Sequence, residues 1–122
     1  MINKISRTRL RQIRHERLRK KIIGTDDRPR LAIFKSHRHL YAQVINDVIG
    51  NTLVSVSTLE SGLKDVIQEK STEEIARFLG ETIAERAIKN GIEAVVFDRS
   101  GYKFHGTLVA FAEGARKKGL QF

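Results

Sequence analysis

Few residues in this 122-residue chain have the types and spacing that catalysis or metal binding requires. His37 and His39 are spaced like a chelating pair, but the sequence contains no cysteine and no neighbouring Asp or Glu to complete the ligand set. Ser100 lies in an Arg-Ser-Gly triplet without the glycine pattern of a nucleophile elbow. The sequence also lacks a phosphate-binding loop and a dinucleotide fingerprint. It therefore predicts no metal site, no catalytic residue and no cofactor.

One enzymatic alternative stays open, a metal-dependent ribonuclease of the ribonuclease-H-like fold, because its order of strands and helices matches the order expected below. That chemistry needs several converging carboxylates to hold two metal ions. The segments expected to form the first three strands contain no acid. Asp98 is a lone candidate, better explained as a turn residue or as a partner for Arg99. We therefore interpret the chain as a binding protein and not as an enzyme.

Positive charge is concentrated in the N-terminal third of the chain. The whole sequence has 23 Lys and Arg against 14 Asp and Glu, a formal net charge of +9. Residues 1–38 carry 13 bases and 3 acids, a net of +10, whereas residues 39–122 carry 10 bases and 11 acids, a net of −1. A basic arm on a nearly neutral domain indicates a polyanionic partner, and the predominance of arginine in the arm favours RNA.

The basic arm is predicted to cover residues 1–24 and the folded domain residues 25–122, with a hinge in the turn-rich segment 24–29. Basic residues point in nearly all directions around an arm helix, so the free arm is predicted to be helical or disordered and to become ordered among phosphates. A functionless tail, a mitochondrial presequence and a membrane-surface helix are weaker interpretations. The arm has neither the clean apolar face nor the aromatic anchors of a membrane-bound helix. No apolar run is long enough to span a bilayer.

Three short strands are predicted at the start of the domain. Arg30–Lys35, Leu40–Asn46 and Thr52–Thr58 are rich in β-type residues, and the second and third alternate between two faces. The connections between them are short, which makes them neighbours in an antiparallel arrangement. The segment 59–70 fits either a short helix or an ordered loop.

Two helices and a fourth strand are predicted after residue 70. A capping box formed by Ser71 and Glu74 begins the first helix, and Asn90-Gly91 ends it. The apolar run over 92–97 is typical of a buried parallel strand, and the last helix is predicted over about 106–119. The order of elements predicts one α/β domain, in which a mixed sheet of three antiparallel strands plus a parallel strand packs against two helices.

Residue types within these elements predict three features of the packing. The small residues Ala76 and Gly80 are expected to let the first helix lie close to the sheet. Glu85 and Lys89 are spaced as a favourable pair on the exposed face of that helix. Four aromatic residues are predicted to lie in the core: Phe34, Phe78, Phe97 and Phe111.

Four segments are distinctive enough to compare with known families. They read FDRSGYKFHG at 97–106, ARKKGLQF at 115–122, RPRLAIFKS at 28–36 and HLYAQV at 39–44. Together with the Arg-rich leader, these segments resemble the bacterial family of large-subunit ribosomal protein L18. The resemblance covers essentially the whole chain, apart from the segment 59–70, which does not align closely.

The resemblance implies a structural protein of the large ribosomal subunit that binds 5S rRNA and helps attach it to 23S rRNA in the central protuberance. It implies a domain of the ribonuclease-H-like or translational-machinery type with a basic arm, and no catalysis, metal or cofactor. Neighbouring large-subunit proteins are implied as further partners of a monomer in the cytoplasmic ribosome, without membrane association. The RNA-binding residues carried over by position are the arm bases Arg7, Arg9, Arg11, Arg14, Arg17, Arg19, Lys20 and Lys21; the hairpin residues Arg30, Lys35, Ser36, His37, Arg38, His39, Tyr41 and Gln43; and the turn residues Arg99, Ser100, Tyr102, Lys103 and His105.

Strand alternation assigns a direction to part of this set. Tyr41 and Gln43 alternate with two apolar residues, so both are predicted to face away from the core. There they are expected to join Tyr102, Lys103 and His105 in one polar-aromatic surface, where aromatic rings stack on unpaired bases. An ordinary half-buried position in the sheet is the alternative for the two tyrosines.

Overall fold

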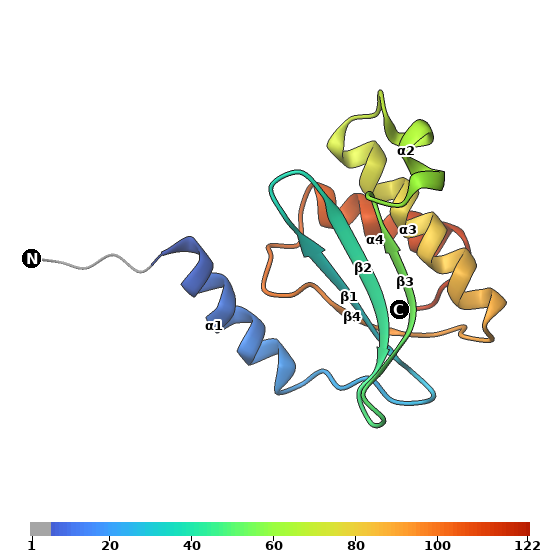
Figure 1. Ribbon diagram of the computed structural model, residues 1–122. Helices are drawn as coiled ribbons and strands as arrows, with labels where there is room; N and C mark the ends of the chain where they lie inside the picture. Colours follow the sequence, from blue (N-terminus) through green and yellow to red (C-terminus); the bar gives the residue numbers. More distant parts are fainter. Residues whose placement is uncertain (1–5) are drawn as a thin grey trace, which may run out of the picture.

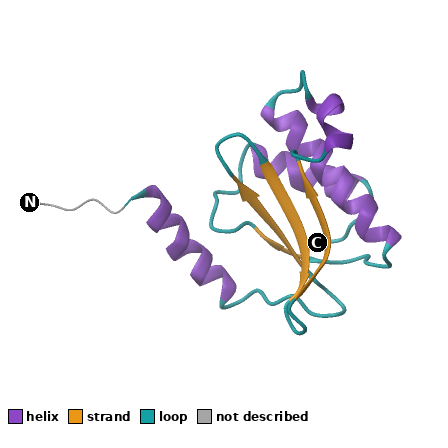
Figure 2. Ribbon diagram, in the orientation of Figure 1, coloured by secondary structure: helices purple, strands orange, loops and turns teal. Residues whose placement is uncertain are grey.

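A four-stranded mixed sheet in the order β3-β2-β1-β4 forms the centre of the computed structural model, which describes residues 6–122 (Figure 2). The strands are β1 (Arg30–Lys35), β2 (Leu40–Asn46), β3 (Asn51–Ser57) and β4 (Val96–Asp98). β1 and β2 have the predicted bounds, and β3 is displaced by one residue. The predicted class, an α/β domain with three antiparallel strands and one parallel strand, is confirmed.

Strand register places the end of β4 beside the middle of β1. β1 runs antiparallel to β2, with Phe34 opposite Tyr41, and parallel to β4, with Ala32 beside Asp98. The turn that follows Asp98 therefore runs alongside the last residues of β1. This register brings a C-terminal turn close to the first hairpin, as the sequence interpretation required.

The fourth strand is shorter than the predicted segment 92–97. Its first half turns away from the sheet and pairs with the C-terminal tail, where Ala94 forms a parallel bridge with Gln121. The backbone N–H of Val95 donates to the Gln121 carbonyl oxygen at 3.0 Å, and the Val95 side chain is fully buried. The apolar run thus reflects burial against the tail and not a longer sheet strand.

In the described part of the chain, four helices flank the sheet (Figure 1). They are α1 (Arg7–Arg19), α2 (Ser61–Ile67), α3 (Thr72–Lys89) and α4 (Thr107–Lys117). α3 and α4 cover one face of the sheet, and α1 lies on the side of the other face (Figure 1). The segment 59–70 was predicted as either a short helix or an ordered loop, and the structure shows the short helix α2 there. Within residues 6–122, no helix combines the length and apolarity that crossing a membrane requires.

The helix boundaries follow the predicted capping residues. Ser71 accepts a hydrogen bond from the backbone N–H of Glu74 at 3.3 Å and begins α3. Asn90 caps its C-terminal end. α4 begins after Gly106, and Gly119 follows its last turn with a φ of 103°, a conformation that favours glycine.

One of the four phenylalanines predicted to lie in the core does not. Phe111 is fully buried, and Phe78 and Phe97 are partly buried against the core. Phe34, however, is 51% exposed. Its neighbour Ile33 occupies the inward position on β1, so strand alternation turns Phe34 to the opposite, open face.

The closest helix contact joins α3 to α4, which corrects the expected role of Gly80. A Cβ atom at Gly80 would lie 2.1 Å from the carbonyl oxygen of Phe111, and one at Gly114 would lie 2.1 Å from that of Arg77. The two glycines therefore allow backbone-to-backbone approach between helices and not between helix and sheet. Glu85 of α3 also forms an ion pair with Lys118, the residue after α4, with 3.1 Å between Oε1 and Nζ. The predicted partner of Glu85 was Lys89.

Gly80→Ala should destabilise the domain by about 3 kcal/mol, because the added methyl group overlaps a backbone oxygen that cannot move without shifting α4. Gly62→Ala in α2 is the matched control. No heavy atom lies within 4 Å of the position a Cβ would take there, so we expect no loss of stability. Urea unfolding of the two variants measures the difference, and equal stabilities would contradict the close packing described here.

The segment predicted as a hinge is tied to the turn between β2 and β3. The Gly24 carbonyl oxygen accepts from the backbone N–H of Asp47 at 3.0 Å, and the Asp26 carboxylate accepts from the side-chain amide of Asn46. A Cβ at Gly24 would lie 2.4 Å from the Ile45 carbonyl oxygen. Gly24 is thus fixed to the domain, and the chain leaves this anchor towards α1.

Candidate nucleic-acid interface

Helix α1 contacts the domain through one of its faces. Arg11 Nη1 donates to Tyr102 Oη at 3.0 Å, and the guanidinium carbon lies 4.8 Å from the centre of the tyrosine ring. Arg14 Nε donates to the carbonyl oxygen of Gly101 at 2.9 Å. Residues three and four apart share a helix face, so these side chains reach the same turn. The turn after β4 is therefore the docking point of α1.

Gly101 allows this turn to approach α1 closely. Its φ is 81°, and a Cβ at this position would lie 2.2 Å from the carbonyl oxygen of Arg11. Both the backbone conformation and the available space therefore require glycine.

Asp98 forms the buried centre of the docking point. Its side chain is 0% exposed, and its Oδ2 lies 2.8 Å from Arg30 Nη1 and 3.1 Å from His15 Nε2. Its Oδ1 accepts from the backbone N–H of Ser100 at 2.8 Å. Of the two roles predicted for Asp98, that of a turn residue is confirmed by this bond. The pairing with Arg99 is wrong, since Arg99 donates to a backbone carbonyl oxygen of its own turn at 2.6 Å.

A second carboxylate, Asp47, holds the other side of Arg30. Arg30 Nε and Nη2 donate to the two Asp47 oxygens at 3.0 and 3.1 Å. Asp47 Oδ2 also accepts from the backbone N–H of Gly24 at 2.7 Å and from Arg19 Nη1 at 3.3 Å. We call Arg30, Asp47 and Asp98 the Arg30 network. The Arg30 side chain is only 12% exposed, so its charge is neutralised within the protein.

The basic residues predicted in the arm divide into two sets. The exposed set comprises Arg7, Arg9, Arg17, Lys20 and Lys21. The docked set is partly buried and bound to the domain, and comprises Arg11, Arg14 and Arg19. Within the described part of the arm, an exposed contact of 3.8 Å between Arg9 and Glu16 is the one ion pair of the exposed set. Lys4 lies outside the described residues.

The hairpin residues between β1 and β2 also divide by their contacts. Ser36 and His39 close the turn, since Ser36 Oγ accepts from the His39 backbone N–H at 3.2 Å. His39 Nδ1 lies 2.9 Å from Thr58 Oγ1. His37 and Arg38 are exposed at the tip of the turn. Among residues 6–122, no three His, Asp or Glu side chains lie together in a way that could hold a metal ion.

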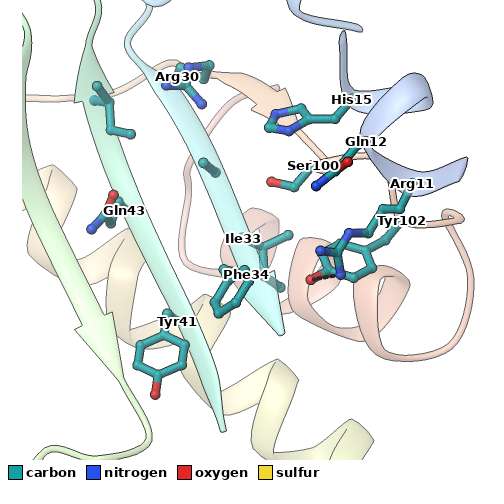
Figure 3. A pocket seen from close by; sticks show the side chains of 12 residues that line it. Arg11, Gln12, His15, Arg30, Ile33, Phe34, Tyr41, Gln43, Ser100 and Tyr102 are labelled. Atoms are coloured by element: carbon teal, nitrogen blue, oxygen red, sulfur yellow. Dashed lines mark hydrogen bonds between the residues drawn. The ribbon is translucent and has the colours of Figure 1, made fainter. Parts of the chain in front are cut away.

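Tyr102 links three elements. Its hydroxyl accepts from the backbone N–H of Lys35 and donates to the Lys35 carbonyl oxygen, both at 3.1 Å, while Arg11 covers its ring. Lys103 and His105 are exposed beyond it. Tyr41, in contrast, lies on the sheet, across a cavity from Tyr102 (Figure 3). The two tyrosines therefore lie on opposite walls of one cavity, with Tyr41 on the sheet and Tyr102 on the docking turn.

The cavity between α1 and the open face of the sheet has a volume of about 580 Å³ (Figure 3). On the sheet side, Phe34 and Tyr41 lie as a cross-strand pair with ring centres 5.7 Å apart. Residue type alone predicted a core position for Phe34. The rule of strand alternation, which placed Tyr41 on the open face, predicts that face for Phe34 as well. The lining residues are Arg11, Gln12, His15, Arg30, Ala32, Ile33, Phe34, Tyr41, Gln43, Ile45, Ser100 and Tyr102.

Comparison with known proteins identifies the family of the chain. The family described as ribosomal L18 of archaea, bacteria, mitochondria and chloroplast matches residues 5–122. Two relatives named large ribosomal subunit protein uL18, from Thermotoga neapolitana and Dictyoglomus thermophilum, are each 52% identical over 122 residues, with both chains fully covered. A third of the same name, from Syntrophomonas wolfei subsp. wolfei, is 53% identical over 122 residues and also fully covered.

The chain belongs to the ribosomal L18 family. The predicted resemblance is thereby confirmed. Proteins of the L18 family are structural and not enzymatic, so the ribonuclease alternative is set aside. Two features of this L18 family member have no assigned ligand: the exposed bases of the arm and the cavity between α1 and the sheet.

Acid should weaken the Arg30 network of this L18 family member through Asp47. The hydrogen bonds from Arg30, together with the Gly24 N–H and the charges of Arg30 and Arg19, lower the pKa of Asp47 from 3.8 to about 2 against the opposing effect of burial. Since the folded pKa lies below the unfolded one, the stabilisation is complete above about pH 4 and is lost as the pH falls towards 2. It amounts to roughly 2 kcal/mol.

Urea unfolding at pH values between 2 and 6 measures this acid dependence. Asp47→Asn keeps hydrogen-bond acceptance but removes the titrating group, so its stability should fall less steeply over the same interval. An identical acid dependence of wild type and Asp47→Asn would contradict the role of Asp47.

Proposed function

We propose that this chain is a structural protein of the large ribosomal subunit, within the ribosome in the cytoplasm, where it binds 5S rRNA and helps attach it to 23S rRNA in the central protuberance. The observation that carries the proposal is its full-length identity of about 52% to proteins named large ribosomal subunit protein uL18. It acts there as a monomer, with both RNAs and neighbouring large-subunit proteins as partners.

The distribution of charge supports an RNA-binding role. The five bases of the exposed set lie on α1 and on the two residues that follow it, and they are exposed to solvent. His37 and Arg38 form a second exposed group at the hairpin tip, whereas Lys103 and His105 line a cavity together with Arg7 of the exposed set. Two such groups suit a protein that holds two RNA segments together, because each can neutralise phosphates of a different segment.

Binding to purified 5S rRNA tests the proposal. The full chain should bind a 5S rRNA transcript at least about 100-fold more tightly than a structured RNA of equal length at physiological salt. Equal affinities for the two RNAs would contradict 5S recognition. Incubation of the same complex with Mg²⁺ should leave the RNA intact, whereas specific cleavage would restore the ribonuclease alternative.

Attachment to 23S rRNA needs its own measurement. Labelled 5S rRNA should be retained on immobilised 23S rRNA in greater amount when the chain is added. Retention that is unchanged by the chain would limit the function to 5S binding.

A further inference from the structure

The open face of the sheet carries an aromatic pair that the hydrophobic core does not use. Phe34 and Tyr41 lie opposite each other on β1 and β2, and their rings are tilted by 40°. α3 and α4 cover the other face of the sheet, so neither ring packs against them. An exposed Phe34 ring and a half-buried Tyr41 ring on one cavity wall are suited to a flat apolar ligand.

The surroundings of the pair define the shape of such a ligand. Ala32 is outward-facing on the same strand as Phe34, and its small side chain leaves room between Phe34 and Arg30. Gln43 lies opposite Ala32 on β2, and Gln12 reaches the cavity from α1 (Figure 3). Amide groups both donate and accept hydrogen bonds, as the edge of a nucleobase does. The cavity thus combines an apolar wall with amide groups at its rim.

We propose that this cavity holds an unpaired RNA base, stacked on Phe34 and Tyr41 and contacted at its edge by Gln43 and Gln12. The proposal rests on the proposed function, since it names the part of the RNA that the protein reads. Stacking on protein rings requires a free base face, which loops and bulges provide and a continuous duplex does not.

The charge around the cavity favours a nucleotide over an apolar peptide. α1 forms one wall, and residues 6–24 contain eight bases and one acid. The two guanidinium groups at the cavity, Arg11 and Arg30, are already bound to Tyr102 and to the two carboxylates of the Arg30 network. Phosphates are therefore expected on the exposed set outside the cavity, and the base within it.

Substitution of Phe34 tests the stacking contact. Phe34→Ala should weaken 5S rRNA binding by about tenfold, while the slope of log affinity against log salt stays unchanged because no charge is lost. Phe34→Tyr should bind like wild type, since it preserves the ring. Leu53→Ala is the matched control, because Leu53 is an exposed apolar residue of the same sheet outside the cavity.

Ultraviolet cross-linking of the wild-type complex identifies the base. Mass spectrometry should find the cross-link on Phe34 or Tyr41, joined to a nucleotide that is unpaired in 5S rRNA. Unchanged 5S affinity of a Phe34→Ala, Tyr41→Ala double variant, or a cross-link to a paired nucleotide, would overturn the inference and leave 5S binding intact. Equal wild-type affinity for 5S rRNA and the control RNA would instead overturn the proposed function.

Discussion

Asp98→Ala should lower the free energy of unfolding by about 3–5 kcal/mol, a large share of the roughly 5–15 kcal/mol that stabilises a typical domain. The Asp98 carboxylate is completely buried and binds Arg30 at 2.8 Å. Its removal leaves a nearly buried guanidinium with one carboxylate in place of two, and leaves the backbone N–H of Ser100 without its acceptor. α1 should also lose the contact made by His15.

Glu113→Ala is the matched control for this prediction. It breaks the ion pair between Glu113 and Arg77, which has a similar separation of 3.1 Å but lies in solvent, so it should cost less than about 1 kcal/mol. Urea and thermal unfolding compare the two variants. A loss below about 1 kcal/mol in Asp98→Ala would show that the Arg30 network does not support the fold. Any loss of RNA binding in Asp98→Ala must be judged against this loss of stability.

Log affinity falls as log salt rises, and each phosphate contact contributes about 0.7–0.9 to the steepness of this dependence. Replacing all five bases of the exposed set with glutamine should therefore make the dependence shallower by roughly 3.5–4.5. These side chains are exposed along α1 and just after its end, where RNA phosphates can reach them. The fold should be unaffected, since none of them belongs to the Arg30 network. Filter binding of 5S rRNA across a salt series measures the slope.

The docked set is the matched comparison. Glutamine at Arg11, Arg14 and Arg19 removes three charges that already bind the domain, so the slope should change by less than about 1. The expected effect is instead faster hydrogen exchange in α1, because its contacts with the domain are lost. A decrease in slope proportional to the number of charges removed in both sets would contradict the division of the arm.

Strand alternation predicted the sheet well because α3 and α4 bury only one of its faces. The bounds of β1 and β2 and the outward direction of Tyr41 and Gln43 follow from this rule. Phe34 was assigned to the core from its residue type, although its position on β1 is an outward one. On a sheet with one covered face, the position of a residue in the strand therefore determines which face its side chain takes, even where residue type suggests the other face.

The contacts of Asp98 and Arg30 could not be predicted in the same way. Asp98 binds Arg30 and His15 across 68 and 83 residues of chain, and nothing local to the turn indicates either partner. The basic character of Arg30 suggested RNA, whereas its side chain is held between two carboxylates. Similarly, the small size of Gly80 indicated close packing but not that α4 would be the neighbour. The RNA contacts of the remaining site residues stay predictions.

The docking of α1 on the turn after β4 has a consequence for biosynthesis. The residues joined by these hydrogen bonds are 83, 87 and 91 positions apart, so the most cationic part of the chain is made first and its docking point is made late. At about 5–20 residues per second, the arm emerges roughly 5–20 s before that turn exists. During this interval the nascent arm can bind any nearby polyanion. A chain terminated before Asp98 would never acquire the docking point.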